Sequence, residues 1–163
     1  AASYSVDNVH TNVGFSVKHM MITNVKGDFK TYDAQIDFDE ATKSFKTFSA
    51  NVNTASIDTG IEKRDEHLRS DDFFASEKFP KMTFVMKSYE SDGNEGKMKG
   101  DLTIRGITKP VTFDITVNGN TATTTFNVDR TKYDIKYGSG SFFDGLGDKA
   151  IYDEFDLTVK LAF

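Results

Sequence analysis

Apolar and polar residues alternate along most of this chain, and phenylalanine carries much of the alternation. The chain has fifteen Phe and no Trp. In residues 13–18, 82–86 and 111–117, every second residue is apolar. Successive side chains of a strand point to opposite faces, so this period of two predicts strands that bury one face only. Because the pattern recurs along nearly the whole chain, we expect the sheet to close on itself around an apolar interior.

The alternation defines ten expected strands, joined by residues that favour turns. The strands cover residues 4–6, 9–18, 25–31, 34–38, 49–56, 81–89, 97–104, 111–118, 121–128 and 154–163. Asn118-Gly119 lies between two alternating runs and predicts a type I′ hairpin, because both central residues of that turn need positive φ. Turns are also predicted at residues 39–44, 92–96 and 106–110. The predicted fold class is therefore an all-β, antiparallel β-barrel.

One stretch, residues 58–79, breaks the two-residue period and predicts a helical insertion. Thr59 followed by Glu62 has the form of a capping box, which marks a helix start. The helix is expected to span about ten residues, with one face made of Ile61, Arg64, Asp65 and Leu68. A second short helical turn is predicted from Ser70, with acidic residues in its first turn. The apolar side of this insertion needs a surface to lie against, so we expect it to cover one barrel end, with Phe73, Phe74 and Phe79 underneath.

Composition excludes several classes of function. The length suits one domain, predicted to span residues 1–163. The absence of cysteine excludes disulfides, thiolate metal sites and a cysteine nucleophile. A net charge of −5, without basic residues interleaved with aromatics, argues against nucleic acid as a partner. No apolar run is long enough to cross a bilayer, so no integral membrane segment is expected.

The histidines do not suggest a metal site. His10 and His19 differ by an odd number on one expected strand and so face opposite sides, which disfavours a triad with His67. His19 shares parity with Phe15 and Val17, so it is expected either as a hydrogen-bonded histidine at the barrel rim or as a ligand contact. The Gly-x-Ser-x-Gly turn of serine hydrolases is absent as well.

The polar residues of the expected helix have two interpretations. Arg64 and Asp65, followed by His67, either form an ion pair that fixes the helix to the barrel rim or take part in binding. The ion pair is the favoured interpretation. The adjacent carboxylates of residues 71–72 and 153–154 are more typical of helix caps, or of opposite strand faces, than of acid/base partners.

Arg130 continues the inward parity of Phe126 and Val128, although arginine is almost never fully buried without a partner. Either the strand ends before Arg130 and its side chain reaches water, or the guanidinium pairs with a carboxylate or with the anionic head of a ligand. The sequence leaves this choice open.

Residues 137–147 form a second irregular stretch, in which four glycines surround Phe142 and Phe143. This composition suggests a mobile loop near a barrel end. A phosphate-binding turn requires a helix after its glycines, whereas a strand-like run follows here at residues 151–155. Phosphate binding is therefore disfavoured.

Three blocks of residues occur in an order and spacing that are specific together. The first is His10 with residues 15–19 (FSVKH); the second is residues 64–74 (RDEHLRSDDFF) with Phe79-Pro80 and Thr83-Phe84; the third is residues 100–111 (GDLTIRGITKPV). Together they resemble the bacterial YceI family over essentially the whole chain. Residues 130–135 (RTKYDI) resemble the family's arginine-containing strand near the C-terminus, but Asp134 stands where the family often has glycine.

The resemblance implies an extended, lipocalin-like antiparallel β-barrel of about eight strands with one helical insertion covering an end. It also implies a long apolar ligand, a polyisoprenoid or related amphiphile, and export to the periplasm. Paired chains, as a homodimer, are compatible with the family. The small residues at the start, Ala1-Ala2-Ser3, are typical of a signal cleavage site, although a cloning scar has the same appearance.

The leading hypothesis is a non-enzymatic protein that transports or stores an isoprenoid, quinone or fatty-chain lipid inside the barrel, with no other cofactor and no metal. The residues predicted to bind this lipid are Phe15, Val17, His19, Phe29, Leu68, Phe73, Phe74, Phe84, Met86, Leu102, Ile104, Phe113, Phe126, Val128 and Arg130. One alternative is an enzyme in which His19, Arg130 or His67 acts on a lipid head group or quinone. Another is a packed barrel that serves as an interaction module.

Overall fold

The structure is a computed structural model that describes residues 2–19, 24–146 and 150–163, without the side chains of residues 18, 19 and 24. The first half of the chain forms β1 (Ala2–Ser5), β2 (Asn12–His19), β3 (Asn24–Phe29), β4 (Tyr32–Asp39), β5 (Ser44–Asn53), the 3₁₀ turn η1 (Thr54–Ser56), β6 (Ile57–Asp58) and α1 (Glu62–Arg69). The second half forms β7 (Lys81–Asp92), β8 (Glu95–Ile104), β9 (Ile107–Asn118), β10 (Thr121–Asp129), η2 (Arg130–Tyr133) and β11 (Ile151–Ala162).

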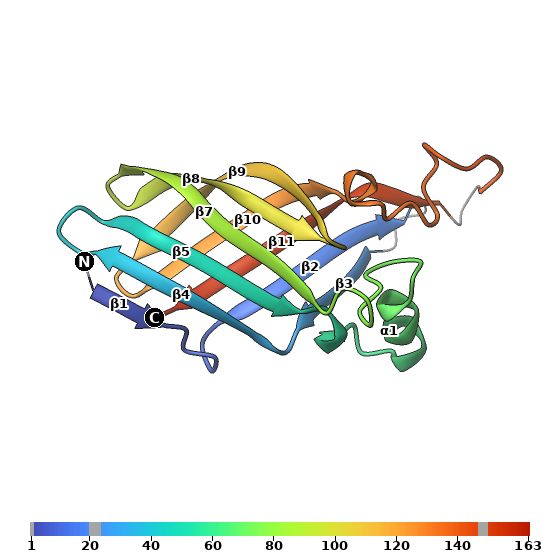
Figure 1. Cartoon of the computed structure of the whole chain (residues 1–163), viewed down its shortest axis with the longest axis horizontal. Coiled ribbons are helices and arrows are strands. Elements are labelled where there is room, and N and C mark those ends of the chain that lie inside the picture. The colour runs from blue at the N-terminus through green and yellow to red at the C-terminus, as the bar shows by residue number, and fades with distance from the viewer. Residues whose placement is uncertain (1, 20–23, 147–149) are drawn as a thin grey trace.

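The predicted all-β antiparallel fold is confirmed. All the strands belong to one curled sheet in the order β1-β4-β5-β7-β8-β9-β10-β11-β2-β3-β6, which wraps around an elongated interior (Figure 1). Each of the ten predicted strands is present, most of them a few residues longer than expected. The sheet has eleven strands rather than about eight, in part because the short strands β1 and β6 extend its two edges.

Within the described part of the chain, strand pairing does not close the sheet, because β1 and β6 are its edges. Its two sides are joined by the chain itself, since β3 near one edge continues through Lys30 and Thr31 into β4 near the other. Hydrogen bonds support this junction: the Lys30 N–H donates to the Ser56 carbonyl at 3.1 Å, and the Tyr32 hydroxyl donates to the Thr11 carbonyl at 2.7 Å. The curled sheet therefore behaves as a barrel without a complete ladder around it.

Two predicted turns differ in detail from the structure. The hairpin between β9 and β10 exists, but its two turn residues are Gly119 and Asn120, and Gly119 has the positive φ of 57°. The loop predicted at residues 106–110 is shorter, because Arg105 and Gly106 turn the chain with φ of 53° and 72° and β9 begins at once. Pro110, which suggested a longer loop, instead pairs with Asp101 inside β9.

Pro110 is tolerated there because β9 is in effect an edge strand along that part of its length. The ladder between β9 and β10 comprises three residue pairs beside the hairpin, whereas β8 and β9 pair over ten. Beyond those three pairs, the Thr124 hydroxyl donates to the Asp114 carbonyl at 2.6 Å. The rings of Phe113 and Phe126 stack at 4.4 Å between centroids and 17° between planes. We call this boundary the β9–β10 seam, because side chains rather than backbone pairs close it.

Aromatic side chains fill the interior in successive clusters. The first contains Phe15, Phe29 and Phe74, and the second contains Phe48, Phe84, Phe113 and Phe126. The third contains Tyr4, Phe38, Phe45, Tyr89 and Phe163. The third cluster marks the packed end, where both termini lie, and α1 marks the opposite helix end (Figure 1). The predicted inward faces of the strands are confirmed by these contacts.

The helix begins differently from the prediction. Its N-cap is Ile61, which makes no side-chain capping bond, so the predicted capping box at Thr59 is wrong. Gly60, with φ of 86°, turns the chain between Thr59 and the helix. Thr59 instead binds the buried Asp65, its backbone N–H and hydroxyl donating to that carboxylate at 3.0 and 2.6 Å. The helix is held to the barrel from its middle rather than from its first residue.

The segment after α1 is a series of turns, not the second helical turn predicted there. The Ser70 hydroxyl donates to the His67 carbonyl at 2.6 Å and so ends the helix. The Phe74 N–H then donates to the Leu68 carbonyl at 3.0 Å, which folds the segment back under α1.

Among the described residues, no helix is long and apolar enough to span a membrane.

The inward register makes a direct prediction for stability. Phe113 is buried, whereas its neighbour Thr112 is exposed on the outer face. Replacing Phe113 by Asp places an unpaired carboxylate among aromatic rings and should lower the free energy of unfolding by more than about 3 kcal/mol. The control Thr112→Asp should change it by less than about 0.5 kcal/mol. Urea unfolding measures both, and equal losses would contradict the register.

Candidate functional site

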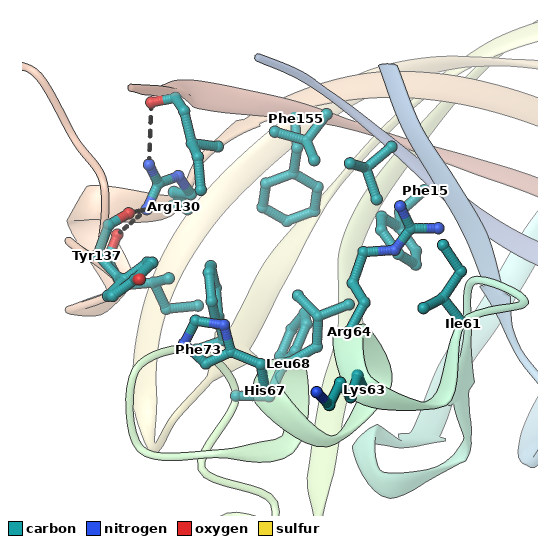
Figure 2. A pocket seen from close by; sticks show the side chains of 15 residues that line it. Phe15, Ile61, Lys63, Arg64, His67, Leu68, Phe73, Arg130, Tyr137 and Phe155 are labelled. Atoms are coloured by element: carbon teal, nitrogen blue, oxygen red, sulfur yellow. Dashed lines mark hydrogen bonds between the residues drawn. The ribbon is translucent and has the colours of Figure 1, made fainter. Parts of the chain in front are cut away.

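A cavity of about 650 Å³ opens at the helix end, and its size is typical of ligand pockets. Its walls come from α1 and the turns after it, from β2 and β3, and from the chain around η2 and the start of β11. The lining residues are Phe15, Val17, Val25, Ile61, Lys63, Arg64, His67, Leu68, Phe73, Phe74, Arg130, Ile135, Tyr137, Ile151 and Phe155. Figure 2 shows Arg64, Ile61 and Phe15 on one side of this cavity and Arg130 and Tyr137 on the other.

The predicted lipid-binding residues divide into groups along the barrel. Phe15, Val17, Leu68, Phe73, Phe74 and Arg130 line the large cavity. Phe84, Leu102, Phe113 and Phe126 line a second, smaller cavity of about 80 Å³ deeper in the barrel. Phe29, Ile104 and Val128 are buried in the core and Met86 packs against it, but none of these four lines either cavity. The side chain of His19 lies outside the described part of the structure.

Several lining residues were not predicted from the sequence. Outside the predicted lipid-binding set are Ile61, Arg64 and His67, which the sequence placed on or beside the helix, and Val25, Lys63, Ile135, Tyr137, Ile151 and Phe155. Val25 and Phe155 fall in predicted strands, so the alternation of those strands could have identified them as inward-facing. Ile135 and Tyr137 follow η2 in an irregular segment, and no local pattern indicates that this segment turns toward α1. Their position depends on contacts made by Arg130.

Arg130 holds the segment after η2 against β11. Its side chain is only 4% exposed, and β10 ends just before it, at Asp129. Nη1 donates to the carbonyls of Ile135 and Tyr137 at 3.0 and 2.8 Å. Nε and Nη2 donate to the carbonyls of Tyr152 and Ile151 at 2.9 and 3.1 Å. The sequence left open water, a carboxylate or the anionic head of a ligand as the partner of Arg130. The strand does end before Arg130, but the partners in the structure are backbone carbonyls.

Charged groups surround the Arg130 guanidinium at a greater distance. Burial lowers the pKa of Arg130, while Asp153 and Asp129 act to raise it. Burial also acts to raise the pKa of Asp153, but hydrogen bonds from the hydroxyls of Ser139 and Ser141, together with Arg130, hold that pKa below its usual value. Asp153 is therefore ionised at neutral pH and fixes the loop that contains both serines.

His67 is a polar group at the opening of the cavity. Its Nε2 lies 2.8 Å from a carboxylate oxygen of Asp72. Its ring packs edge-on against Phe73 and Tyr137, with centroids 5.0 and 4.7 Å away. The ring of Phe73 in turn lies 5.2 Å from that of Tyr137. These three rings connect residues 70–79 after α1, which we call the cover segment, to the segment that Arg130 holds.

Arg64 does not form the predicted ion pair with Asp65. Its Nε donates to the Thr59 hydroxyl at 2.7 Å and its Nη2 to the Thr59 carbonyl at 3.0 Å. Because Asp65 accepts hydrogen bonds from the same threonine, both side chains reach the barrel through Thr59 rather than through each other. The exposed Lys63 lies beside Arg64 at the cavity opening (Figure 2).

Arg105, in the turn between β8 and β9, binds the backbone of the cover segment and fixes it to the barrel. Its Nη1 donates to the carbonyls of Asp71 and Phe73 at 2.5 and 2.8 Å. Its Nη2 lies 3.9 Å from the carboxylate of Asp134, which follows η2. The ring of Phe74 packs inside, 5.7 Å from that of Phe29. The predicted role of Phe73 and Phe74 as the underside of a cover agrees with these contacts.

The site combines apolar walls with a few cations at its opening. Most lining side chains are aromatic or aliphatic, and the polar ones are Lys63, Arg64, His67, Tyr137 and Arg130. Within the described ranges, no three His, Asp or Glu side chains lie close enough together to hold a metal ion. Such a cavity suits a molecule with an apolar body and a polar end.

Comparison with known proteins finds relatives over most of the chain. The profile of one family, described as the YceI-like domain, matches residues 4–163. A UPF0312 protein of Staphylococcus epidermidis is 45% identical over 116 residues, which cover 71% of this chain and 66% of the relative. A UPF0312 protein of Staphylococcus aureus strain USA300 is 41% identical over 117 residues, 72% of this chain and 66% of the relative. The aligned part thus spans just under two thirds of these relatives.

Three solved structures are similar in fold. The protein BcnA of Burkholderia cenocepacia superposes with a TM-score of 0.83 at 27% identity, over 97% of this chain and 99% of that one. The YceI protein of Campylobacter jejuni superposes with a TM-score of 0.76 at 35% identity, over 98% and 96%. A polyisoprenoid-binding domain of Saccharophagus degradans superposes with a TM-score of 0.69 at 12% identity, over 99% and 98%, which shows the shared fold alone.

The contacts of Arg130 predict a large effect of its replacement. Arg130→Lys leaves one ammonium where a guanidinium reaches four carbonyls, and it should lower the free energy of unfolding by at least about 2 kcal/mol. The amide of Ile151, which donates to the Gly138 carbonyl at 2.7 Å, should exchange its hydrogen faster in this variant. The exposed Lys132→Met serves as the control. Unchanged stability and unchanged exchange in Arg130→Lys would contradict this role.

Proposed function

Because the chain belongs to the family of YceI-like domains, we propose that it binds a long-chain amphiphile and transports or stores it without chemical change. The molecule is a polyisoprenoid, an isoprenoid quinone or a fatty-acid derivative. One observation carries the proposal: the apolar cavity of about 650 Å³ at the helix end, with cations at its opening. Residues 1–163 act as one binding domain, and the protein works in the periplasm.

The apolar tail enters the cavity, and the polar head stays at its opening. Each methylene moved out of water contributes about 0.8 kcal/mol, although ligands of this size retain only about 0.3 kcal/mol per heavy atom after the cost of ordering. The tail contacts Phe15, Phe74 and Phe155, which come from three different parts of the chain. The head lies near Lys63 and Arg64. Because each buried methylene adds to the binding free energy, tail length contributes more to affinity than the chemistry of the head does.

A tail longer than the cavity extends toward the smaller cavity of about 80 Å³ deeper in the barrel. It has to pass the aromatic cluster formed by Phe15, Phe29 and Phe74. Methionine is the most adaptable apolar side chain, and Met82 and Met98 line the smaller cavity. Small rearrangements of these side chains lengthen the space available without moving the strands.

The relatives support the ligand class in general terms. The domain of Saccharophagus degradans with the same fold is described as polyisoprenoid-binding. At 12% identity the similarity is one of fold, so the nature of the tail and head of the ligand is part of our proposal. The enzyme alternative would require the same cavity to convert its ligand, which a turnover measurement distinguishes from binding.

The proposal predicts a bound lipid in the purified protein. Protein produced in bacteria should yield a long-chain lipid on organic extraction, at close to one molecule per chain by mass spectrometry. Native and denaturing mass spectra that agree on the bare protein would contradict the carrier and favour a packed barrel used as an interaction module. Conversion of the extracted molecule, or of an added quinone, on incubation with fresh protein would favour the enzyme.

The position of the cavity predicts that two substitutions on α1 differ in their effect on lipid content. Leu68 lines the cavity, whereas Glu66 is exposed on the same helix. Leu68→Trp adds a large ring inside the site and should reduce the extracted lipid several-fold. Glu66→Trp adds the same ring outside and should leave the lipid content unchanged. Equal lipid in both variants would place the ligand somewhere other than this cavity, and circular dichroism confirms that each variant is folded.

A further inference from the structure

Large apolar side chains are exposed mainly at one end of the molecule. Within the described ranges, Ile61, Tyr137, Phe142, Phe143 and Tyr152 are exposed at the helix end, whereas Val9 and Val85 are exposed elsewhere. Single exposed apolar residues are normal on a protein surface, but a group of them at one end indicates an interaction site. The two adjacent phenylalanines are the most unusual members, because both are about half exposed, at 51% and 52%.

Phe142 and Phe143 are held outward by a hydrogen-bonded turn, residues 139–143, which we call the aromatic turn. Both of their backbone N–H groups donate to the Ser139 carbonyl, at 3.2 and 3.1 Å. Ser139 is fully buried, and its hydroxyl binds Asp153 of β11. The Ser141 hydroxyl binds the same carboxylate at 2.5 Å. The phenyl rings are therefore presented to the outside by a fixed base.

The charges around the aromatic turn balance. Lys136 and Asp144 flank it, and the Lys136 ammonium lies 4.8 Å from the centre of the Phe142 ring. Lys132 and Asp134 are the next exposed charges toward η2. Among the described residues beside the turn, these two cations and two anions give no net charge, so a polyanion or a strongly anionic surface is not the matching partner. The patch instead suits a neutral phase that accepts aromatic rings and leaves charged groups in water.

The aromatic turn adjoins the cavity opening through Tyr137. This residue lines the cavity and is also 43% exposed beside the turn. A surface that meets the patch therefore also meets the opening. An amphiphile of the proposed class is stored in a lipid bilayer, because its tail keeps its free concentration in water low. The partner that combines a neutral aromatic-accepting interface with a supply of such molecules is a bilayer.

We propose that the helix end docks on a zwitterionic lipid bilayer, with Phe142 and Phe143 inserted among the head groups and the cavity opening held against them. This inference rests on the proposed function for the choice of a bilayer over a second copy of the chain. Docking shortens the path of the ligand, which passes between bilayer and cavity without exposing its tail to water.

Vesicle binding tests the docking directly. The chain contains no tryptophan, so Phe143→Trp introduces a fluorophore that reports on this position alone. Its emission should shift to the blue on addition of phosphatidylcholine vesicles. In co-sedimentation, replacing both Phe142 and Phe143 by Ser should weaken binding at least about tenfold, since burial of the exposed halves of the two rings together exceeds the 1.4 kcal/mol that a factor of ten requires. The control replaces Val9 and Val85 by Ser and should bind as the unmodified chain does.

The possible outcomes separate docking from its alternatives. Unchanged emission, or equal vesicle binding by the double serine variant and the unmodified chain, would overturn the docking. A steep loss of binding at high salt would also overturn it, because the patch carries no net charge. A concentration-dependent dimer that the double serine variant abolishes, without vesicle binding, would assign the patch to self-association.

The lipid content of the same samples tests the proposed function separately. Bound lipid without vesicle binding would leave the carrier and remove the docking. Vesicle binding without bound lipid would retain the docking and remove the carrier. Mass spectrometry of the purified chain before any vesicle is added provides this second measurement.

Discussion

A buried guanidinium organises the helix end of this barrel. Arg130 donates to four carbonyls on two separate segments, and charge-assisted hydrogen bonds contribute about 1.5–3 kcal/mol each. It acts together with the Ile151 N–H, which donates to the Gly138 carbonyl, and with Asp153, which accepts from Ser139 and Ser141, to hold the chain after η2 against β11. This arrangement forms one wall of the cavity, brings Tyr137 to the opening and supports the base of the aromatic turn. The site and the proposed docking surface therefore depend on the same side chain.

The strands could be predicted because their signal is local. A period of two places Phe84 and Phe113 on the inner face wherever the strand goes, and the structure confirms both. Features that depend on the direction of a turn or on a distant partner cannot be predicted in this way. The spacing of Thr59 to Glu62 predicts a cap, but the turn at Gly60 directs Thr59 to Asp65 instead. Arg130 found its partners in β11, about twenty residues away, and no pattern around it indicates that.

The sequence predicts which strand residues face the interior, but not how deep in the barrel each of them lies. Parity identifies which side chains face inward, yet it treats Phe15 and Phe113 alike. The structure separates them, because Phe15 lines the large cavity and Phe113 lines the small one. The space arises where α1 and the segment after η2 cap the barrel without filling it. That depends on tertiary contacts such as those of Arg105 with the cover segment.

The β9–β10 seam makes the stiffness of the barrel directional. Opening the wall between β8 and β9 would break a ladder of ten residue pairs, whereas opening it at the seam separates one hydroxyl–carbonyl contact and one pair of stacked rings. A stacked aromatic pair contributes about 0.5–1.5 kcal/mol beyond its buried area, which is comparable with a single hydrogen bond. The seam is therefore a line along which the girth of the barrel can increase while its length stays fixed. In the proposed carrier, side-chain movement at Phe113 and Phe126 would make room there for a branched or bulky chain.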